Sequence, residues 1–170
     1  MHRLGPVNDP RIFFTMTAPS AFKDLTDHRA AVRAAAAKAL GSSLSAEALP
    51  ALIAVLKDEH TRVRIEAAHS LGKIGDAGAG PALVPLLCDR DTGVRLAAMV
   101  ALGKIKDRSA LEPLIACLHD RDMQVRVGAI ETLAVIGDAR ATGPIRTLLQ
   151  DRFSDVRESA QRAIAKLSRK

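Results

Sequence analysis

Arginine and aspartate recur in this chain at a spacing that could bring opposite charges together. A Val-Arg pair occurs five times, each copy 31 residues after the last, and supplies Arg33, Arg64, Arg95, Arg126 and Arg157. An aspartate stands six residues before each arginine: Asp27, Asp58, Asp89, Asp120 and Asp151. We expect each arginine to pair with a carboxylate of its own or a neighbouring repeat, at about 1.5–3 kcal/mol per buried pair. If the arginines instead point into water, they form a basic row.

The other residues that could do chemistry form no catalytic or metal-binding pattern. The histidines make no His-x-x-x-His pair, and the cysteines make no Cys-x-x-Cys pair; the histidines are His2, His28, His60, His69 and His119. Nothing in the periodicity gathers a Ser-His-Asp or Cys-His set. We therefore expect no catalytic residue, no metal and no cofactor.

The elements that must position these side chains are helices. Val63, Ala67, Leu71 and Ile74 fall on one face of a helix, and the same pattern returns every 31 residues. A fixed period of this length is typical of a solenoid. The sequence thus predicts an all-α solenoid of five stacked helix pairs. Their approximate ranges are 18–41, 46–74, 78–105, 109–136 and 140–168.

Composition agrees with packed helices rather than a sheet. Hydrophobic residues make up 48% of the chain and aromatic residues 2%, so alanine and leucine must form the core. Cys117 falls in an apolar register and Cys88 in a polar one. Two cysteines form no disulfide framework, which fits a reduced, cytoplasmic setting. No apolar run is long enough to span a membrane.

The residues between helices predict how the helices start and stop. Gly75 and Gly137 suit the left-handed position after a helix, and the turn at Lys106 should be less regular because a lysine replaces the glycine. Asp91 and Asp122 are candidate N-caps. Pro85 should kink its helix or delay its start.

Residues 1–17 lie outside the repeats, and we expect an irregular tail ahead of a single repeat domain over 18–170. Its Phe13 and Phe14 are candidates to fold back over the first helix. The sequence leaves open whether Met1 or Met16 is the true start.

The repeats resemble a known family. The pattern Asp-x-x-x-x-Val-Arg-x-x-Ala-x-x-x-Leu-Gly-x-Ile-Gly-Asp, complete from Asp58 to Asp76, is similar to the HEAT-like repeats of the phycobilisome lyase group. The resemblance covers about residues 19–168. It implies first helices on a convex face and second helices on a concave face. Because such repeats occur in bilin lyase subunits, scaffolds and regulators, it specifies fold far better than function.

Charge alone does not predict nucleic-acid binding. The net charge is +6, but half of this excess lies in residues 153–170, which also read as a polar capping helix. Tyrosine and tryptophan are absent, so stacking platforms for bases are missing. A nucleic-acid module is therefore the least favoured of the functions considered.

A predicted apolar patch on the second helices favours a protein partner. The concave registers place apolar residues in the middle repeats, with charge at both ends. The candidate site consists of Ile65, Leu96, Val100, Val127, His69, Glu131, Arg62 and Gln124. We expect Leu96 and Val100 to be accessible, in a non-catalytic scaffold or accessory subunit that binds a protein there. A bilin lyase or isomerase subunit acting on phycobiliproteins is the alternative, and the patch could also be a dimer contact or a docking site for the tail. The oligomeric state stays open.

Overall fold

The computed structural model describes residues 18–168, so the predicted tail with Phe13 and Phe14 lies outside the described residues. Within this range 81% of residues are helical and none lies in a strand. The all-α prediction is confirmed.

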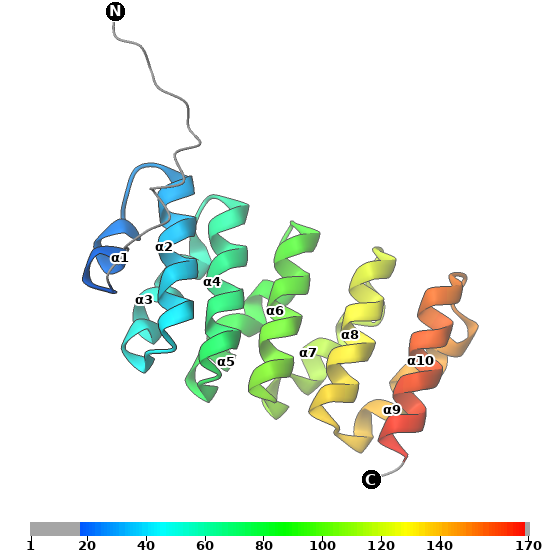
Figure 1. The fold of residues 1–170 in the computed structure, drawn as a ribbon. Coiled ribbons are helices and arrows are strands. Elements are labelled where there is room, and N and C mark those ends of the chain that lie inside the picture. Colours follow the sequence, from blue (N-terminus) through cyan, green and yellow to red (C-terminus); the bar gives the residue numbers. More distant parts are fainter. Residues whose placement is uncertain (1–17, 169–170) are drawn as a thin grey trace, which may run out of the picture.

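Each repeat pairs a short, broken first element with a longer second helix (Figure 1). The second helices are 14 residues each: α2 (Ala30–Ser43), α4 (Thr61–Ile74), α6 (Thr92–Ile105), α8 (Met123–Ile136) and α10 (Ser154–Leu167). The first helices are α1 (Ala18–Asp24), α3 (Leu49–Ala54), α5 (Gly80–Leu83), α7 (Leu111–Cys117) and α9 (Thr142–Thr147). Short 3-10 turns flank them: η2 (Ala46–Ala48), η3 (Val55–Lys57), η4 (Ala77–Ala79), η5 (Val84–Cys88), η6 (Arg108–Ala110), η7 (Ala139–Ala141) and η8 (Leu148–Gln150).

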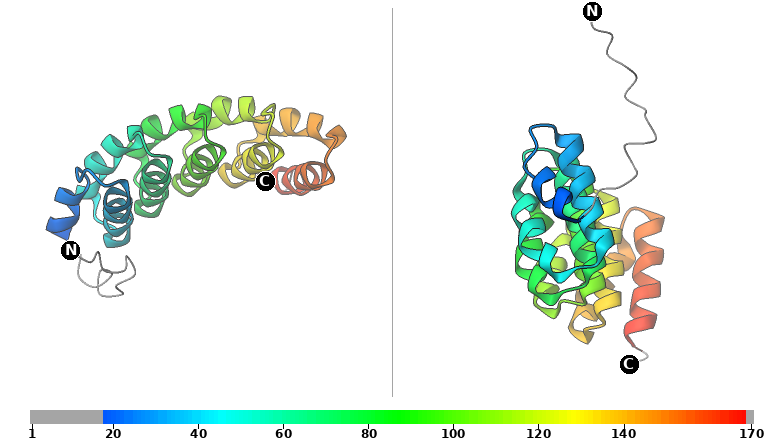
Figure 2. Two further views of the ribbon diagram at one scale, coloured as in Figure 1. Left: turned by 90° about the horizontal axis from the view of Figure 1, so that it is seen from above. Right: turned by 60° about the vertical axis from the view of Figure 1, so that its left-hand side comes forward.

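The pairs stack into an arc. Viewed from above, the first helices run along the convex side and the second helices line the concave side (Figure 2). This is the arrangement that the family resemblance implied. It leaves one face of each second helix open on the inside of the arc.

The turns between repeats share one geometry. Gly75 and Gly137 adopt φ values of 75° and 76°, and Lys106 occupies the same left-handed position at 57°. The prediction of a less regular turn at Lys106 was wrong. An L-residue there costs roughly 1–2 kcal/mol, yet the chain keeps the turn, and Asp107 caps the next element by accepting the Ser109 N–H at 2.8 Å.

The predicted N-caps are confirmed, whereas Pro85 acts differently from the prediction. Asp91 and Asp122 each accept a backbone N–H at the start of their second helix. Pro85 cannot donate the helical hydrogen bond. α5 does not start late: it begins at Gly80, ends at Leu83 and continues as the 3-10 turn η5, so Pro85 coincides with an early end of the helix.

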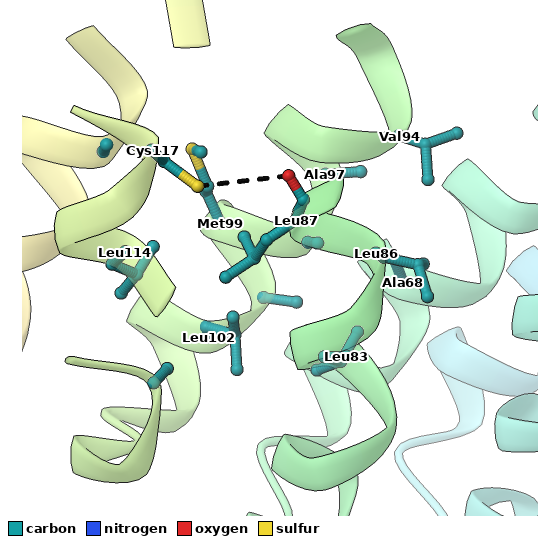
Figure 3. Packing of buried hydrophobic residues seen from close by; sticks show 14 of the residues in the cluster. Ala68, Leu83, Leu86, Leu87, Val94, Ala97, Met99, Leu102, Leu114 and Cys117 are labelled. Carbon is teal, nitrogen blue, oxygen red and sulfur yellow. Dashed lines mark hydrogen bonds between the residues drawn. The ribbon is translucent and has the colours of Figure 1, made fainter. Parts of the chain in front are cut away.

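The core runs unbroken between the two layers of helices. Leu71, Leu102 and Leu133 repeat the same register and are fully buried. Cys117 is also buried, with its sulfur 4.0 Å from the Leu87 carbonyl oxygen (Figure 3), and burial raises its pKa to about 11. Both cysteines are free, and Cys88 is exposed.

Small residues set the distance between neighbouring second helices. A Cβ at Gly72 would lie 2.7 Å from the Cα of Ala101, and one at Gly41 would lie 2.6 Å from the Cα of Ser70. At the next interface, a Cβ on Gly103 would meet only side-chain methyl groups at ordinary distances, 3.4 Å to Thr132 and 3.8 Å to Val135. The helices α2, α4 and α6 are therefore closely packed, whereas α6 and α8 leave more room between them.

Candidate functional site

Buried arginines join consecutive repeats. Arg33 donates from Nε and Nη2 to the two carboxylate oxygens of Asp58, at 2.7 and 2.9 Å. Its Nη1 donates to the Asp27 carbonyl oxygen at 2.8 Å, so one guanidinium holds its own repeat and the next. Arg64 with Asp89, and Arg126 with Asp151, repeat this geometry at 2.9–3.0 Å. We call these arginine–aspartate pairs the rungs.

The rung between Arg95 and Asp120 is looser. Its Nε–Oδ2 distance is 3.2 Å, and its Nη2–Oδ1 distance is 3.4 Å. Among the described residues this buried Nε has no hydrogen-bond partner. Nη2 shares its donors between this long bond to Asp120 and a shorter one to the Thr92 hydroxyl, at 3.1 Å. The arginine and aspartate side chains that join repeats three and four are thus further apart than those of the other rungs.

Two residues of the predicted ladder do not form a rung. The Asp27 carboxylate accepts from Arg29 at 2.9 and 3.0 Å. Arg157 donates to the Asp151 carbonyl oxygen at 2.8 Å and, within residues 18–168, has no carboxylate partner in an ion pair. The reason is positional, because each rung needs the aspartate of the following repeat.

The carboxylates of the three tight rungs, Asp58, Asp89 and Asp151, have lowered pKa values that favour their charged form. The Arg33 hydrogen bond lowers the pKa of Asp58. Burial is the largest single influence on the pKa of Asp89 and Asp151 and acts to raise it, but the hydrogen bonds from Arg64 and Arg126, a backbone N–H and the nearby positive charges together outweigh it, so both pKa values are lowered. Groups bound in this way serve structure and are poor proton-transfer catalysts.

A groove opens on the concave face between α6 and α8. It has a volume of about 570 Å³, and Leu96, Val100 and Val127 are among the apolar residues that line it. Val100 is 45% exposed, whereas Leu96 is partly buried against the core. Gln124 and Glu131 complete the wall as polar residues. We call this the α6–α8 groove.

Only part of the predicted patch lines the α6–α8 groove. Five of its eight residues line the α6–α8 groove: Leu96, Val100, Gln124, Val127 and Glu131. The other three do not. Ile65 is partly buried and lies toward Gly93 of the next repeat, and Arg62 is exposed elsewhere on α4. His69 is half-buried; burial lowers its pKa, and the nearby Lys104 and Lys73 lower it further, whereas Glu66 acts to raise it.

Sequence analysis missed Val135, which also lines the groove and is 42% exposed. Its register was informative, since the equivalent residues are Ser42, Lys73, Lys104 and Lys166. A valine at an exposed position that is polar in the other repeats indicates a surface that binds a partner. Thr132 and Met99, which complete the floor, were missed because their registers read as core.

The groove continues toward the C-terminus. A second hollow of about 320 Å³ between α8 and α10 shares Glu131 and Val135 with it, and Arg162 and Lys166 line its far wall. The apolar surface is therefore bounded by basic residues at the C-terminal end of the arc.

The described residues contain no group of three or more His, Cys, Asp or Glu side chains placed to hold a metal ion. In the same part of the chain, no helix has the length and apolar character needed to cross a membrane.

Comparison with known proteins identifies the repeat. HEAT repeats match residues 19–98 and 80–165. The chain belongs to the HEAT-repeat family. A comparison with curated protein sequences found no match.

Solved structures agree with this assignment. A chain in the complex of CpcE and CpcF of phycocyanin lyase from Nostoc sp. PCC7120 is 29% identical, with a TM-score of 0.82 over 100% of this HEAT-repeat chain and 70% of that chain. The expected resemblance to the lyase group is confirmed. An engineered protein is 26% identical at a TM-score of 0.65, covering 89% and 79% of the two chains. A designed armadillo repeat protein, 23% identical at a TM-score of 0.70 over 87% and 80%, shares the fold.

Proposed function

We propose that this HEAT-repeat protein is a non-catalytic scaffold or accessory subunit that binds a protein partner in the α6–α8 groove. The observation that carries the proposal is the pair Val100 and Val135, both exposed in the same concave groove. Exposed apolar groups with a polar rim characterise the centre of a protein interface.

The groove is suited to an apolar side chain or a helix of the partner. The loose contact at Gly103 leaves space between the two helices, and at Gly128 the side chains of Leu96 and Met99 pack against the bare backbone. The nearby Lys104 and Lys106 would favour acidic residues on the partner around its apolar anchor. The two free cysteines fit a reducing compartment, so we place the protein in the cytoplasm.

The test compares partner capture from the native host by three forms of the chain. Val100→Asp combined with Val135→Asp should abolish capture, because two charges would enter the apolar groove. Leu44→Asp is the matched control, since Leu44 is 63% exposed and lies at the end of α2, away from the groove. Equal capture by all three folded proteins would refute the groove as the binding site.

A second candidate function is a subunit of a bilin lyase or isomerase acting on phycobiliproteins. The similarity over the whole chain to a phycocyanin lyase component favours it. Co-expression with a phycobiliprotein, a bilin and a second candidate subunit tests it by visible absorbance of the purified phycobiliprotein. No gain in attached chromophore over the same mixture without this chain would exclude that role.

A further inference from the structure

Three exposed arginines share one register on the edge of the solenoid opposite the turns between repeats. Arg90, Arg121 and Arg152 each occupy the loop that leads from a first element into a second helix. These loops follow one another along the upper edge of Figure 1. The first two repeats carry His28 and Glu59 at this position, so the arginine row belongs only to repeats three to five.

The rungs hold the loops beneath these arginines in place. Asp89, Asp120 and Asp151 each accept the backbone N–H two residues ahead, at 2.8–2.9 Å, which fixes the intervening arginine at the tip of a turn. The same three carboxylates bind the rung arginines of the preceding repeats. The backbones of the three tips are therefore held in the register of the helical layers, about 10 Å apart.

A hollow lies between each two successive arginines of the row. Arg90 and Arg121 line one hollow of about 660 Å³, together with Val84 and Pro113. Arg121 and Arg152 line the next, of about 450 Å³, in which Leu118 and Leu148 lie beside His119 and the charged groups of two rungs. The edge therefore carries a mainly apolar hollow between Arg90 and Arg121 and a mixed one, lined mainly by polar residues, between Arg121 and Arg152.

None of the nearby acids forms an ion pair with the row among the described residues. The three rung aspartates are paired with buried arginines, and Asp91 and Asp122 cap helices by accepting backbone N–H groups. Among the ion pairs of residues 18–168, none involves Arg90, Arg121 or Arg152. Arg152 lies over the Phe153 ring, with its guanidinium carbon 4.7 Å from the ring centre.

We propose that this edge binds an extended, acidic segment of a protein partner, with a carboxylate at every third residue. A polyproline II segment has three residues per turn and rises about 3.1 Å per residue, so such carboxylates lie on one side at intervals of about 9.3 Å. This spacing matches the layers that carry the arginines. Small apolar residues between the acids would enter the hollows.

The same surface is less suited to nucleic acid. A phosphate backbone offers nothing apolar to the hollow between Arg90 and Arg121, and the chain has no tyrosine or tryptophan on which bases could stack. Peptide carboxylates flanked by apolar residues satisfy both features of the edge at once.

The experiment uses a fluorescent peptide with four Glu-Pro-Ala repeats and measures its affinity for the full chain by anisotropy at low salt. Arg90→Glu, Arg121→Glu and Arg152→Glu combined should weaken binding at least about tenfold, a loss of about 1.4 kcal/mol. Glutamate already occupies this register at Glu59, so the substitutions suit the loop. A matched control reverses three exposed basic residues elsewhere, Arg108, Arg146 and Lys166, and should change affinity less than twofold.

Two further measurements sharpen the result. A peptide of the same composition with its four glutamates contiguous should bind more weakly than the spaced one. Val100→Asp with Val135→Asp should leave peptide affinity unchanged, which separates this edge from the α6–α8 groove. Equal weakening by the row and control variants, equal affinity for both peptides, or tighter binding of an oligo-dT strand than of the spaced peptide would overturn the proposal.

Discussion

Neighbouring second helices meet differently in the two halves of the arc. From α2 to α6, glycine faces a small residue so closely that a Cβ would approach the next backbone to 2.6–2.7 Å. From α6 to α8, Gly103 faces Thr132 with ordinary spacing, and the α6–α8 groove opens there. The loosest rung, Arg95 with Asp120, joins these same repeats. Close packing thus stabilises the first half, whereas the second half keeps surface free for binding.

The largest expected effect comes from removing a tight rung. Arg64→Ala should lower the free energy of unfolding by about 3–5 kcal/mol, because it leaves the Asp89 carboxylate largely buried without its partner. Arg95→Ala should cost less, about 1–3 kcal/mol, since its rung is already loose. Urea unfolding measures both.

The control for these two variants is Lys104→Ala, which removes an exposed charge and should have little effect. If Arg95→Ala costs as much as Arg64→Ala, the two rungs are equally strong and the contrast between the halves fails.

A pair of glycine substitutions tests helix packing directly. Gly72→Ala should destabilise by about 1–3 kcal/mol, because the new methyl group would collide with the Ala101 backbone. Gly103→Ala should instead stabilise by about 0.5–1 kcal/mol through its helix preference, since the methyl group fits beside Thr132. Opposite shifts in Tm are the expected result, and shifts of the same sign would argue against a difference in spacing.

Acid should weaken the tight rungs in both halves. The pKa values of Asp58, Asp89 and Asp151 are lowered in the folded chain. Their contribution is therefore present above the ordinary aspartate pKa of about 3.9 and is lost as pH falls below it through the folded values.

Urea midpoints between pH 5 and pH 2.5 should fall for the native chain. They should fall less steeply for Arg64→Met, in which Asp89 has lost the hydrogen bond that lowers its pKa. Parallel slopes for the two proteins would show that this rung does not contribute to the acid response.

The smallest effect is expected in the open half. Val135→Lys restores the lysine found at this register in Lys73, Lys104 and Lys166, and should change the free energy of unfolding by less than about 0.5 kcal/mol. Loss of several kcal/mol in urea unfolding would mean that Val135 belongs to the core rather than to a free surface.

The fold was predictable because every repeat carries the same residues at the same step. The spacing of Val63, Ala67 and Leu71 is enough to predict the buried face of the helix. Asp91 likewise predicts the start of its helix from local sequence alone. The sequence did not predict which aspartate each arginine would bind. An aspartate six residues before Arg64 and another 25 residues after it are equally available in sequence, and only stacking selects Asp89.

The groove was predicted in part for a related reason. Register identified Leu96, Val100 and Val127 as concave residues, but a groove also requires two helices to stand apart. That spacing depends on Gly103 facing Thr132 instead of alanine or serine, a contact across repeats. Ile65 belongs to the predicted patch but does not line the groove, since its own interface is closed.

The offset of the rungs bears on how such a chain can change length. Each rung joins an arginine to an aspartate 25 residues further on, in the following repeat. Every internal repeat thus supplies an arginine that binds the next repeat and an aspartate that binds the arginine of the previous repeat. Tandem duplication or loss of a 31-residue segment, wherever it is cut, would keep the remaining partners in register. Arg157, which has no carboxylate partner among the described residues, is where an added copy would pair without any new mutation.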